Sequence, residues 1–294
     1  MQLRSKVTRR NQDAPFTNCV VSYSVAGRGA TDRLVLLACG PGVSAELGRK
    51  FSAMHFLLTN DDGIDADGLR ALADAIAMLP HGRLSIVAPE REQSQCGHRV
   101  TTHEPIRVEQ RGDDRFAVRG TPADCVRVAL FGLGLQPDFV VSGINHGGNM
   151  GQDLVISGTV AAAREAAYHG VRAAAFSHYL IKGIPLDWRR MAVWTGEVLR
   201  SLLEEPLSEG EFWNVNFPHI EPGPSALPEV TRCLPARSPL RVEFAADAGR
   251  TEFRYTAAYS TRPQDAGSDV EACFGGKVAV SRLSILHGNE KGLQ

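Results

Sequence analysis

Phe56-Leu57-Leu58-Thr59-Asn60-Asp61-Asp62-Gly63 is an apolar run that ends in two adjacent carboxylates and a glycine. The apolar part predicts a buried strand, because parallel strands that are covered on both faces are continuously hydrophobic. Residues 68–79 follow with apolar side chains at helical spacing, which predicts an amphipathic helix. Asp61 and Asp62 would then lie at the carboxyl end of a strand, where open α/β sheets bind ligands. Adjacent carboxylates repel each other unless a cation or a shared proton neutralises them, although Asp-Asp-Gly taken alone is better explained as a solvated turn.

Beyond Met54 the sequence alternates between apolar runs and helical patterns, which is typical of a parallel sheet with crossover helices. Thr121, Pro122 and Asp124 have the spacing of a helix cap, a first-turn proline and a capping box. The expected strands are 84–88, 139–141, 171–176 and 212–217, with a hairpin of 106–109 and 116–118 and helices that end near 131, 169 and 203.

The chain changes character after Pro218, where prolines cluster. Further β segments are expected at 240–245, 251–259 and 277–285. We interpret 218–294 as an α+β extension, or arm, that is suited to an oligomer contact. The sequence therefore predicts a core at 54–217 and an arm at 218–294 within one domain.

The composition of the 294 residues is that of an ordinary globular protein, with 43% hydrophobic and 22% charged residues. The formal net charge of −1 gives no bulk electrostatic case for binding nucleic acid or a membrane surface. No apolar stretch is long enough to span a bilayer. The six cysteines show neither disulfide nor zinc spacing, so we expect a reducing, cytoplasmic location.

Residues 1–53 differ from the rest of the chain. Their start is basic, and their one apolar run, 34–38, lies too far along the chain for a secretory signal. A transit peptide is a second interpretation, because such segments are basic and poor in acids. We prefer a third interpretation, in which translation begins at Met54 and the upstream residues are a start-site artefact or a disordered extension.

A glycine-rich stretch follows the expected strand at 139–141. Residues 142–153 combine glycines with short amide and carboxylate side chains, and Ser157-Gly158-Thr159 then precedes an alanine-rich helix. Glycines let backbone N–H groups approach a ligand closely, and a helix amino end with Ser and Thr can bind phosphate. The alternative is a mobile glycine loop with an ordinary Thr159 cap, and a glycine loop of this kind is weak evidence by itself. The stretch matches neither a P-loop nor a dinucleotide-binding fingerprint.

Several expected strands end in hard oxygen donors or amides. Such donors suit Mg²⁺, Mn²⁺ or Ca²⁺ rather than Zn²⁺. A divalent ion beside a phosphate-binding loop indicates metal-assisted hydrolysis of a phosphate ester. The residues in question are Asp61, Asp62, Ser94, Asn145, Asn149 and Ser157.

Six blocks between about Met54 and Ser177 resemble the SurE survival-protein nucleotidases and occur in that family's order. They lie at 57–64, 87–89, 121–126, 137–145, 148–151 and 157–160. The resemblance implies an α/β, Rossmann-like three-layer core with a mostly parallel sheet, and one divalent ion, Mg²⁺ or Mn²⁺. It also implies removal of phosphate from nucleoside monophosphates as a 5′-nucleotidase, with 3′-nucleotidase and exopolyphosphatase activity as extensions, in a homodimer or homotetramer.

The same resemblance assigns roles to single residues. Asp61 and Asp62 match the family's catalytic acidic pair, and together with Ser94 and Asn145 they match its metal ligands. The positions that match its phosphate-binding residues are Asn149, Ser157, Gly158 and Thr159. Three positions depart from the family pattern, namely Gln95, Arg99 and Ile156, and these affect the expected substrate preference more than the expected metal site.

Two other functions compete with hydrolysis. A dehydrogenase could use the same sheet, but the absence of a dinucleotide fingerprint argues against it. A module that senses nucleotide or metal without hydrolysis would be indicated by a lost metal ligand, and none is lost. We leave His98, His103 and His146 out of the catalytic set because single loop histidines are more often solvated, and we give Arg262 and Asp269 little weight. The preferred base, the 5′ or 3′ position and the physiological metal stay open.

Overall fold

The computed structural model describes residues 6–7, 21–22, 54–80, 82–221, 223 and 226–285. The chain divides into two compact units, Met1–Ala53 and Met54–Gln294. In the first unit, β1 (Lys6–Val7) and β2 (Val21–Ser22) form an antiparallel pair. The apolar run 34–38, and with it the choice between a transit peptide and a disordered extension, lies outside the described residues.

A nine-stranded sheet runs through the second unit in the order β10-β13-β9-β8-β7-β3-β4-β6-β5. The six strands from β9 to β6 are parallel to one another, whereas β5 and β13 run antiparallel to their neighbours β6 and β9. The strands are β3 (His55–Thr59), β4 (Arg83–Pro89), β5 (Val108–Gly112), β6 (Arg115–Val118), β7 (Phe139–His146), β8 (Arg172–His178), β9 (Glu211–Phe217), β10 (Val230–Arg232) and β13 (Val278–Ser284).

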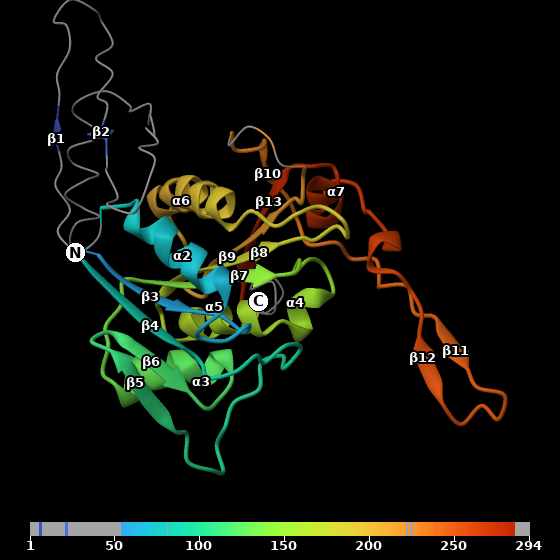
Figure 1. Ribbon diagram of the computed structural model, residues 1–294, viewed down its shortest axis with the longest axis horizontal. Helices are drawn as coiled ribbons and strands as arrows, with labels where there is room; N and C mark the ends of the chain where they lie inside the picture. The colour runs from blue at the N-terminus through green and yellow to red at the C-terminus, as the bar shows by residue number, and fades with distance from the viewer. Residues whose placement is uncertain are drawn as a thin grey trace, which may run out of the picture. The chain divides into compact units, whose positions relative to one another are not determined.

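Helices cover both faces of this sheet (Figure 1). On one face α2 (Asp67–Ala77) packs against α6 (Trp188–Glu204), and on the other face α3 (Pro122–Arg127) packs against α5 (Gly158–Tyr168). The predicted α/β, Rossmann-like three-layer core with a mostly parallel sheet is therefore confirmed. No helix within the described residues is long and apolar enough to cross a membrane.

The core explains why the central strands are continuously hydrophobic. Leu57 and Val140 belong to the cluster of buried side chains under α3 and α5. Their neighbours Phe56 and Phe139 point to the opposite face, because successive side chains of a strand alternate, and the centroids of their two rings lie 6.2 Å apart. Both faces are buried, so neither set of side chains can be polar without a partner.

Two of the predicted helix starts have the expected caps. The Thr121 hydroxyl accepts a hydrogen bond from the backbone N–H of Asp124, whose carboxylate accepts one from the backbone N–H of Thr121. Asp187 caps α6. At α5 the capping residue is Ser157, whose hydroxyl accepts from the backbone N–H of Val160, and not Thr159. The helix expected to reach 131 is α-helical only to Arg127 and continues as a π-helix, Val128–Gly132.

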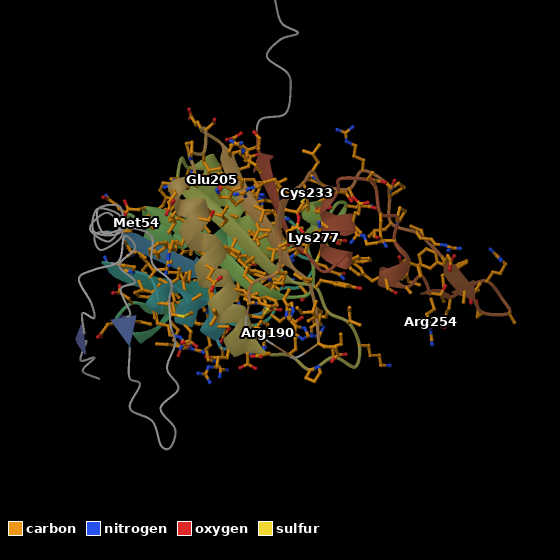
Figure 2. The ribbon with its side chains drawn as sticks, turned by 90° about the horizontal axis from the view of Figure 1, so that it is seen from above. Met54, Arg190, Glu205, Cys233, Arg254 and Lys277 are labelled. Carbon is orange, nitrogen blue, oxygen red and sulfur yellow. The ribbon has the colours of Figure 1, made fainter. Side chains whose placement is uncertain are left out.

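The carboxyl-terminal region does more than form an arm. β13 pairs with β9, β10 pairs with β13, and α7 (Asp269–Phe274) packs on β13, so the sheet continues beyond residue 217. The part that extends away from the sheet carries the hairpin of β11 (Phe244–Ala246) and β12 (Phe253–Tyr255), followed by the short helix η2 (Tyr259–Thr261) (Figure 1). Figure 2 shows Arg254 of this hairpin well apart from Cys233 and Lys277.

Candidate active site

The predicted site residues lie where the order of the sheet reverses. From β3 the chain proceeds to β4 and β6 on one side and then returns to place β7 on the other side of β3. Ligands of open α/β sheets bind beyond the carboxyl ends of strands at such a switch point. Asp61 and Asp62 follow β3 directly, and Asn145 lies near the end of β7.

Asp61 is a buried carboxylate, 5% exposed, that lies against the amino end of α5. Its Oδ1 accepts a hydrogen bond of 2.5 Å from the Thr159 hydroxyl. A Cβ at Gly158 would lie 2.9 Å from the Asp61 Cβ and 3.0 Å from its Oδ2. A glycine at 158 therefore lets the helix end approach the carboxylate closely. The structure thus brings together Asp61, Gly158 and Thr159, which the resemblance had assigned to separate metal-binding and phosphate-binding roles.

Burial, together with the smaller effect of the Asp62 charge, raises the pKa of Asp61 to about 6, although the hydrogen bond from Thr159 lowers it. Burial also raises the pKa of Asp62, although the backbone N–H of His146 donates to its Oδ2 at 3.0 Å. Both carboxylates are thus destabilised as anions in the metal-free protein. A bound cation would remove that cost by favouring the charged forms.

Asn145 reaches this edge through an irregularity in β7. The register between β7 and β8 shifts between Ser142 and Asn145, and Gly143 in this stretch has a φ of +132°. A Cβ at Gly143 would lie 2.2 Å from the carbonyl oxygen of Phe176 in the neighbouring strand, so this position requires glycine. Such bulges redirect side chains near active sites. Asn145 is half-buried, and its amide currently donates to the carbonyl of Gly147 at 2.8 Å.

Asn149 is held in place by the neighbouring strands β8 and β9. Its side-chain amide donates to the Ser177 hydroxyl at 2.7 Å, and its backbone N–H donates to the Asn216 side chain at 2.8 Å. The amides of Asn214 and Asn216 both donate to its carbonyl oxygen. Asn214 and Asn216 are two residues apart, so their side chains emerge on the same face of β9. The sequence contained this signal as Asn-Val-Asn, but it gave no role to either residue.

Ser94 lies in the connection between β4 and β5, which we call the 90–107 loop. Its side chain is exposed, and its hydroxyl donates to Glu92 Oε1 at 2.5 Å rather than to another predicted ligand. The backbone nevertheless places it near the site, because the N–H of Gln93 donates to the carbonyl oxygen of Asp61 at 2.7 Å. On the other side of Ser94, the Cys96 sulfur lies 3.0 Å from where a Cβ of Gly158 would be.

The donor set fits a hard divalent cation. Two carboxylates, a serine hydroxyl and an amide oxygen belong to segments at or beyond the carboxyl ends of β3, β4 and β7, and all are ligands that Mg²⁺ and Mn²⁺ accept. Among the described residues, no group of three or more His, Cys, Asp or Glu side chains could hold a metal ion. A site at this edge consequently depends on serine and asparagine oxygen as well as on the acidic pair.

Sequence reasoning gave too little weight to Arg262 and Asp269, which hold the glycine-rich stretch. Arg262 is 5% exposed, pairs with Asp153 at 2.6 Å and donates to the carbonyl oxygen of Met150 at 2.9 Å. Asp269 accepts hydrogen bonds from the backbone N–H groups of Gly151 and Ala236. Gly151 and Asp153 are thus held by residues more than 100 positions away in the sequence. No pattern in the neighbouring sequence predicts such distant partners.

Comparison with known proteins agrees with this geometry. The family model described as "Survival protein SurE" matches residues 56–238. The chain belongs to the SurE family. The resemblance on which the residue roles were based is therefore confirmed at the level of the family.

Individual SurE relatives cover most of the chain. A putative 5′-nucleotidase alr3139 of Nostoc sp. is 48% identical over 233 residues, which are 79% of this chain and 100% of that protein. A 5′-nucleotidase SurE of Allorhizobium ampelinum is 44% identical over 237 residues, 79% of this chain and 92% of the relative. The crystal structure of the SurE protein from Aquifex aeolicus matches with a TM-score of 0.70 at 31% identity, covering 81% of this chain and 96% of that chain.

Proposed function

We propose that this SurE-family protein is a 5′-nucleotidase that uses one divalent ion, Mg²⁺ or Mn²⁺, to hydrolyse nucleoside monophosphates to nucleoside and phosphate. The observation that carries the proposal is the position of Asp61. Its buried carboxylate lies beside Asp62 and directly against the amino end of α5. An acidic pair next to the amino end of a helix would suit a divalent cation together with a phosphate group.

In this proposal Asp61, Asp62, Ser94 and Asn145 hold the ion. When bound, the ion supplies positive charge that stabilises the phosphoryl oxygens and lowers the pKa of water. Asp61 or Asp62 accepts the proton of the attacking water, because a carboxylate near the reacting phosphate can act as a general base. The hydrogen bond from Thr159 to Asp61 fixes the orientation of that carboxylate.

The phosphate lies against the amino end of α5 and the glycine-rich stretch. The backbone N–H groups of residues 158 and 159 at the start of α5 would donate to its oxygens, as preorganised donors do for charge that develops in a transition state. In the glycine-rich stretch, the N–H groups of residues 146, 149 and 151 already donate to side chains of the protein. Asn149 adds its amide, and its position is fixed by Asn214 and Asn216. Ser157 caps the helix, so its role is to present these N–H groups.

The decisive experiment is a phosphate-release screen across nucleotides with Mg²⁺, Mn²⁺ or a chelator. We expect release from nucleoside 5′-monophosphates that disappears with the chelator. 3′-Monophosphates and polyphosphate belong in the same screen, because the family resemblance implies activity on both. Binding of a nucleoside monophosphate without phosphate release would instead favour a sensor module.

Asp61→Asn tests the assignment of the acidic pair. We expect a loss of about 100-fold or more in phosphate release, as for removal of a single electrostatic group from an active site, with the fold retained. Asp67→Asn is the control, because Asp67 is an exposed carboxylate in the first turn of α2. Retained hydrolysis in Asp61→Asn would refute the assignment.

We further propose a homodimer or homotetramer in the cytoplasm. The exposed hairpin β11–β12 supports the oligomer, and the four described cysteines, all free thiols, support a reducing compartment.

A further inference from the structure

A buried carboxylate outside the proposed metal site joins three parts of the fold. Glu165 lies in the middle of α5 with 2% of its side chain exposed. It accepts hydrogen bonds from His98 Nε2 at 2.6 Å, from Arg127 Nε at 2.5 Å and from His169 Nε2 at 2.9 Å. Burial would raise the pKa of Glu165, but these three donors lower it to about 2, so the carboxylate is ionised at neutral pH.

His98 connects this carboxylate to the loop that carries Ser94. Arg164 donates a hydrogen bond to His98 Nδ1 at 3.3 Å. An arginine can only donate, so Nδ1 is the acceptor and Nε2 carries the hydrogen that faces Glu165. The Tyr168 ring lies 6.0 Å from the imidazole in an edge-on arrangement. The orientation of the His98 ring is thus fixed on three sides.

Further contacts fasten the same part of the 90–107 loop. The backbone N–H of Gly97 donates to the carbonyl oxygen of Ile156 at 2.9 Å, and Thr101 donates to both carboxylate oxygens of Asp124. Ser94, four residues before His98, has its hydroxyl bonded only within the loop in the part of the chain that the structure describes. The position of Ser94 therefore depends on the Gln93 N–H bond to the Asp61 carbonyl oxygen on one side and on the contacts beyond Cys96 on the other.

We propose that Glu165 and His98 are positioning residues that hold the 90–107 loop against the amino end of α5 and so set the affinity of the Asp61, Asp62, Ser94 and Asn145 site for a divalent ion. The inference rests on the proposed function, because it needs the ion. Neither residue belongs to the proposed metal or phosphate ligands. Groups that orient a metal ligand in this way commonly contribute about 10- to 100-fold in metal affinity.

The fold supplies a matched control for this inference. His98 and His169 are both histidines that donate to Glu165 through Nε2, but His169 lies on α5 itself, four residues from Glu165. Removing His169 takes one hydrogen bond from Glu165 without releasing the loop. Removing His98 takes one hydrogen bond from Glu165 and one from Arg164, and with them these side-chain links between loop and helix.

The experiment measures Mn²⁺ binding directly, by electron paramagnetic resonance, in the full chain and in His98→Ala, His169→Ala and His98→Gln. We expect His98→Ala to weaken Mn²⁺ binding about 10-fold and His169→Ala to change it less than 2-fold. His98→Gln should recover most of the affinity, because a glutamine amide can still donate to Glu165. The thermal unfolding midpoint of each variant shows whether it is folded.

Three results would overturn the inference. They are unchanged Mn²⁺ affinity in folded His98→Ala, equal weakening in the two alanine variants, and no recovery in His98→Gln. If His98→Ala does not fold, His98→Gln tests the inference by itself. A folded His98→Gln that binds Mn²⁺ clearly more weakly than the wild type would then contradict the inference. If the wild type neither binds Mn²⁺ nor hydrolyses nucleotides, the proposed function is wrong as well. If the wild type hydrolyses nucleotides with Mn²⁺ but His98→Ala binds Mn²⁺ as tightly as the wild type does, only the positioning role is wrong.

Discussion

At the scale of single residues, Asp61 combines features that a carboxylate rarely has unless it serves a ligand. It is buried, it has Asp62 beside it, and it has only one side-chain donor, Thr159, among the described residues. Glu165 provides the contrast, since its carboxylate is equally buried but receives three donors. Its pKa is lowered to about 2, whereas that of Asp61 is raised to about 6. Among the residues that the structure describes, Asp61 has no positively charged partner, whereas Glu165 receives Arg127 and two histidines.

The raised pKa of Asp61 predicts how the metal-free protein responds to pH. A carboxyl group whose pKa is higher in the folded state stabilises the fold fully below its unfolded pKa, which is near 3.8, and this contribution is lost as the pH rises through about 6. A shift of about two pKa units corresponds to about 3 kcal/mol. In a chelator, the wild type should therefore lose stability relative to Asp61→Asn between about pH 4 and pH 7.

Chemical denaturation at several pH values measures this difference in the free energy of unfolding. Adding Mn²⁺ at pH 7 should restore the stability of the wild type and leave Asp61→Asn unchanged, because an ion that binds only the folded state stabilises it by mass action. A wild type and variant with parallel pH profiles would show that Asp61 is ionised as easily as an exposed carboxyl group.

At the scale of elements, α5 brings the amino end of a helix within contact of Asp61. Its buried face is built from small side chains, Ala162, Ala163 and Ala166, which pack in the same cluster as Leu57 and Val140. Small residues let the helix lie close to the sheet. The same closeness explains why position 158 must be glycine, since the first residue of α5 meets the Asp61 side chain.

Gly158→Ala tests this approach of helix and carboxylate. The added Cβ would lie within 3.0 Å of Asp61 and of the Cys96 sulfur, so the helix end must move. We expect a loss of about 1–3 kcal/mol in stability, as for other overpacked sites, and a fall in phosphate release larger than the loss of folded protein explains. Thermal unfolding and activity at saturating Mn²⁺ measure the two effects.

The control for this substitution is Gly196→Ala in α6. A Cβ there would meet its nearest atom, the carbonyl oxygen of Ala75, at 3.4 Å, which is ordinary contact. Alanine is favoured over glycine in a helix interior by about 1 kcal/mol, so Gly196→Ala should be neutral or stabilising. If the two variants behave alike, the close contact at 158 has no functional meaning.

Elements were predictable where their signal is local. The largely buried strands β3, β7 and β9 and the capping box at Thr121 follow from neighbouring residues alone. The strand β10 has only three residues with mostly exposed side chains, so no apolar pattern marks it. The pairing of β13 with β9 is also a contact between distant segments, which is why the tail looked like a separate arm. Among the polar residues, Asp61 could be named as a candidate ligand because it follows a predicted strand. The interaction of Glu165 with His98 could not be foreseen, because the two residues are 67 positions apart in the sequence.

At the scale of the whole molecule, the sheet and its helices are built from residues after Met54. All nine strands of the main sheet and all helices that cover it belong to the unit Met54–Gln294. The Nostoc relative is matched over its full length by 79% of this chain. We therefore propose that residues 1–53 are dispensable for the fold and for hydrolysis.

A shortened protein that begins at Met54 tests that proposal. We expect its unfolding midpoint to agree with that of the full chain within about 2 °C, a change that corresponds to less than about 1 kcal/mol for a domain of this size. Its phosphate release with Mn²⁺ should equal that of the full chain. Loss of folding or activity would show that the first unit contributes to the domain.

The hairpin β11–β12 makes the last prediction, which concerns assembly. Phe244, Phe253 and Tyr255 are each more than half exposed, and the Phe244 ring lies 5.7 Å from the Tyr255 ring and 6.5 Å from the Phe253 ring. An isolated two-stranded hairpin is only marginally stable in water, so these aromatic side chains need a surface to cover them. A second copy of the chain offers one, since homo-oligomers bury the same patch on each subunit.

We expect Phe244→Ser with Phe253→Ser to reduce the mass measured by sedimentation, and Arg254→Ser on the same hairpin to leave it unchanged. A wild type that sediments as a monomer, or a double variant that keeps the wild-type mass, would show that the hairpin does not hold the assembly together.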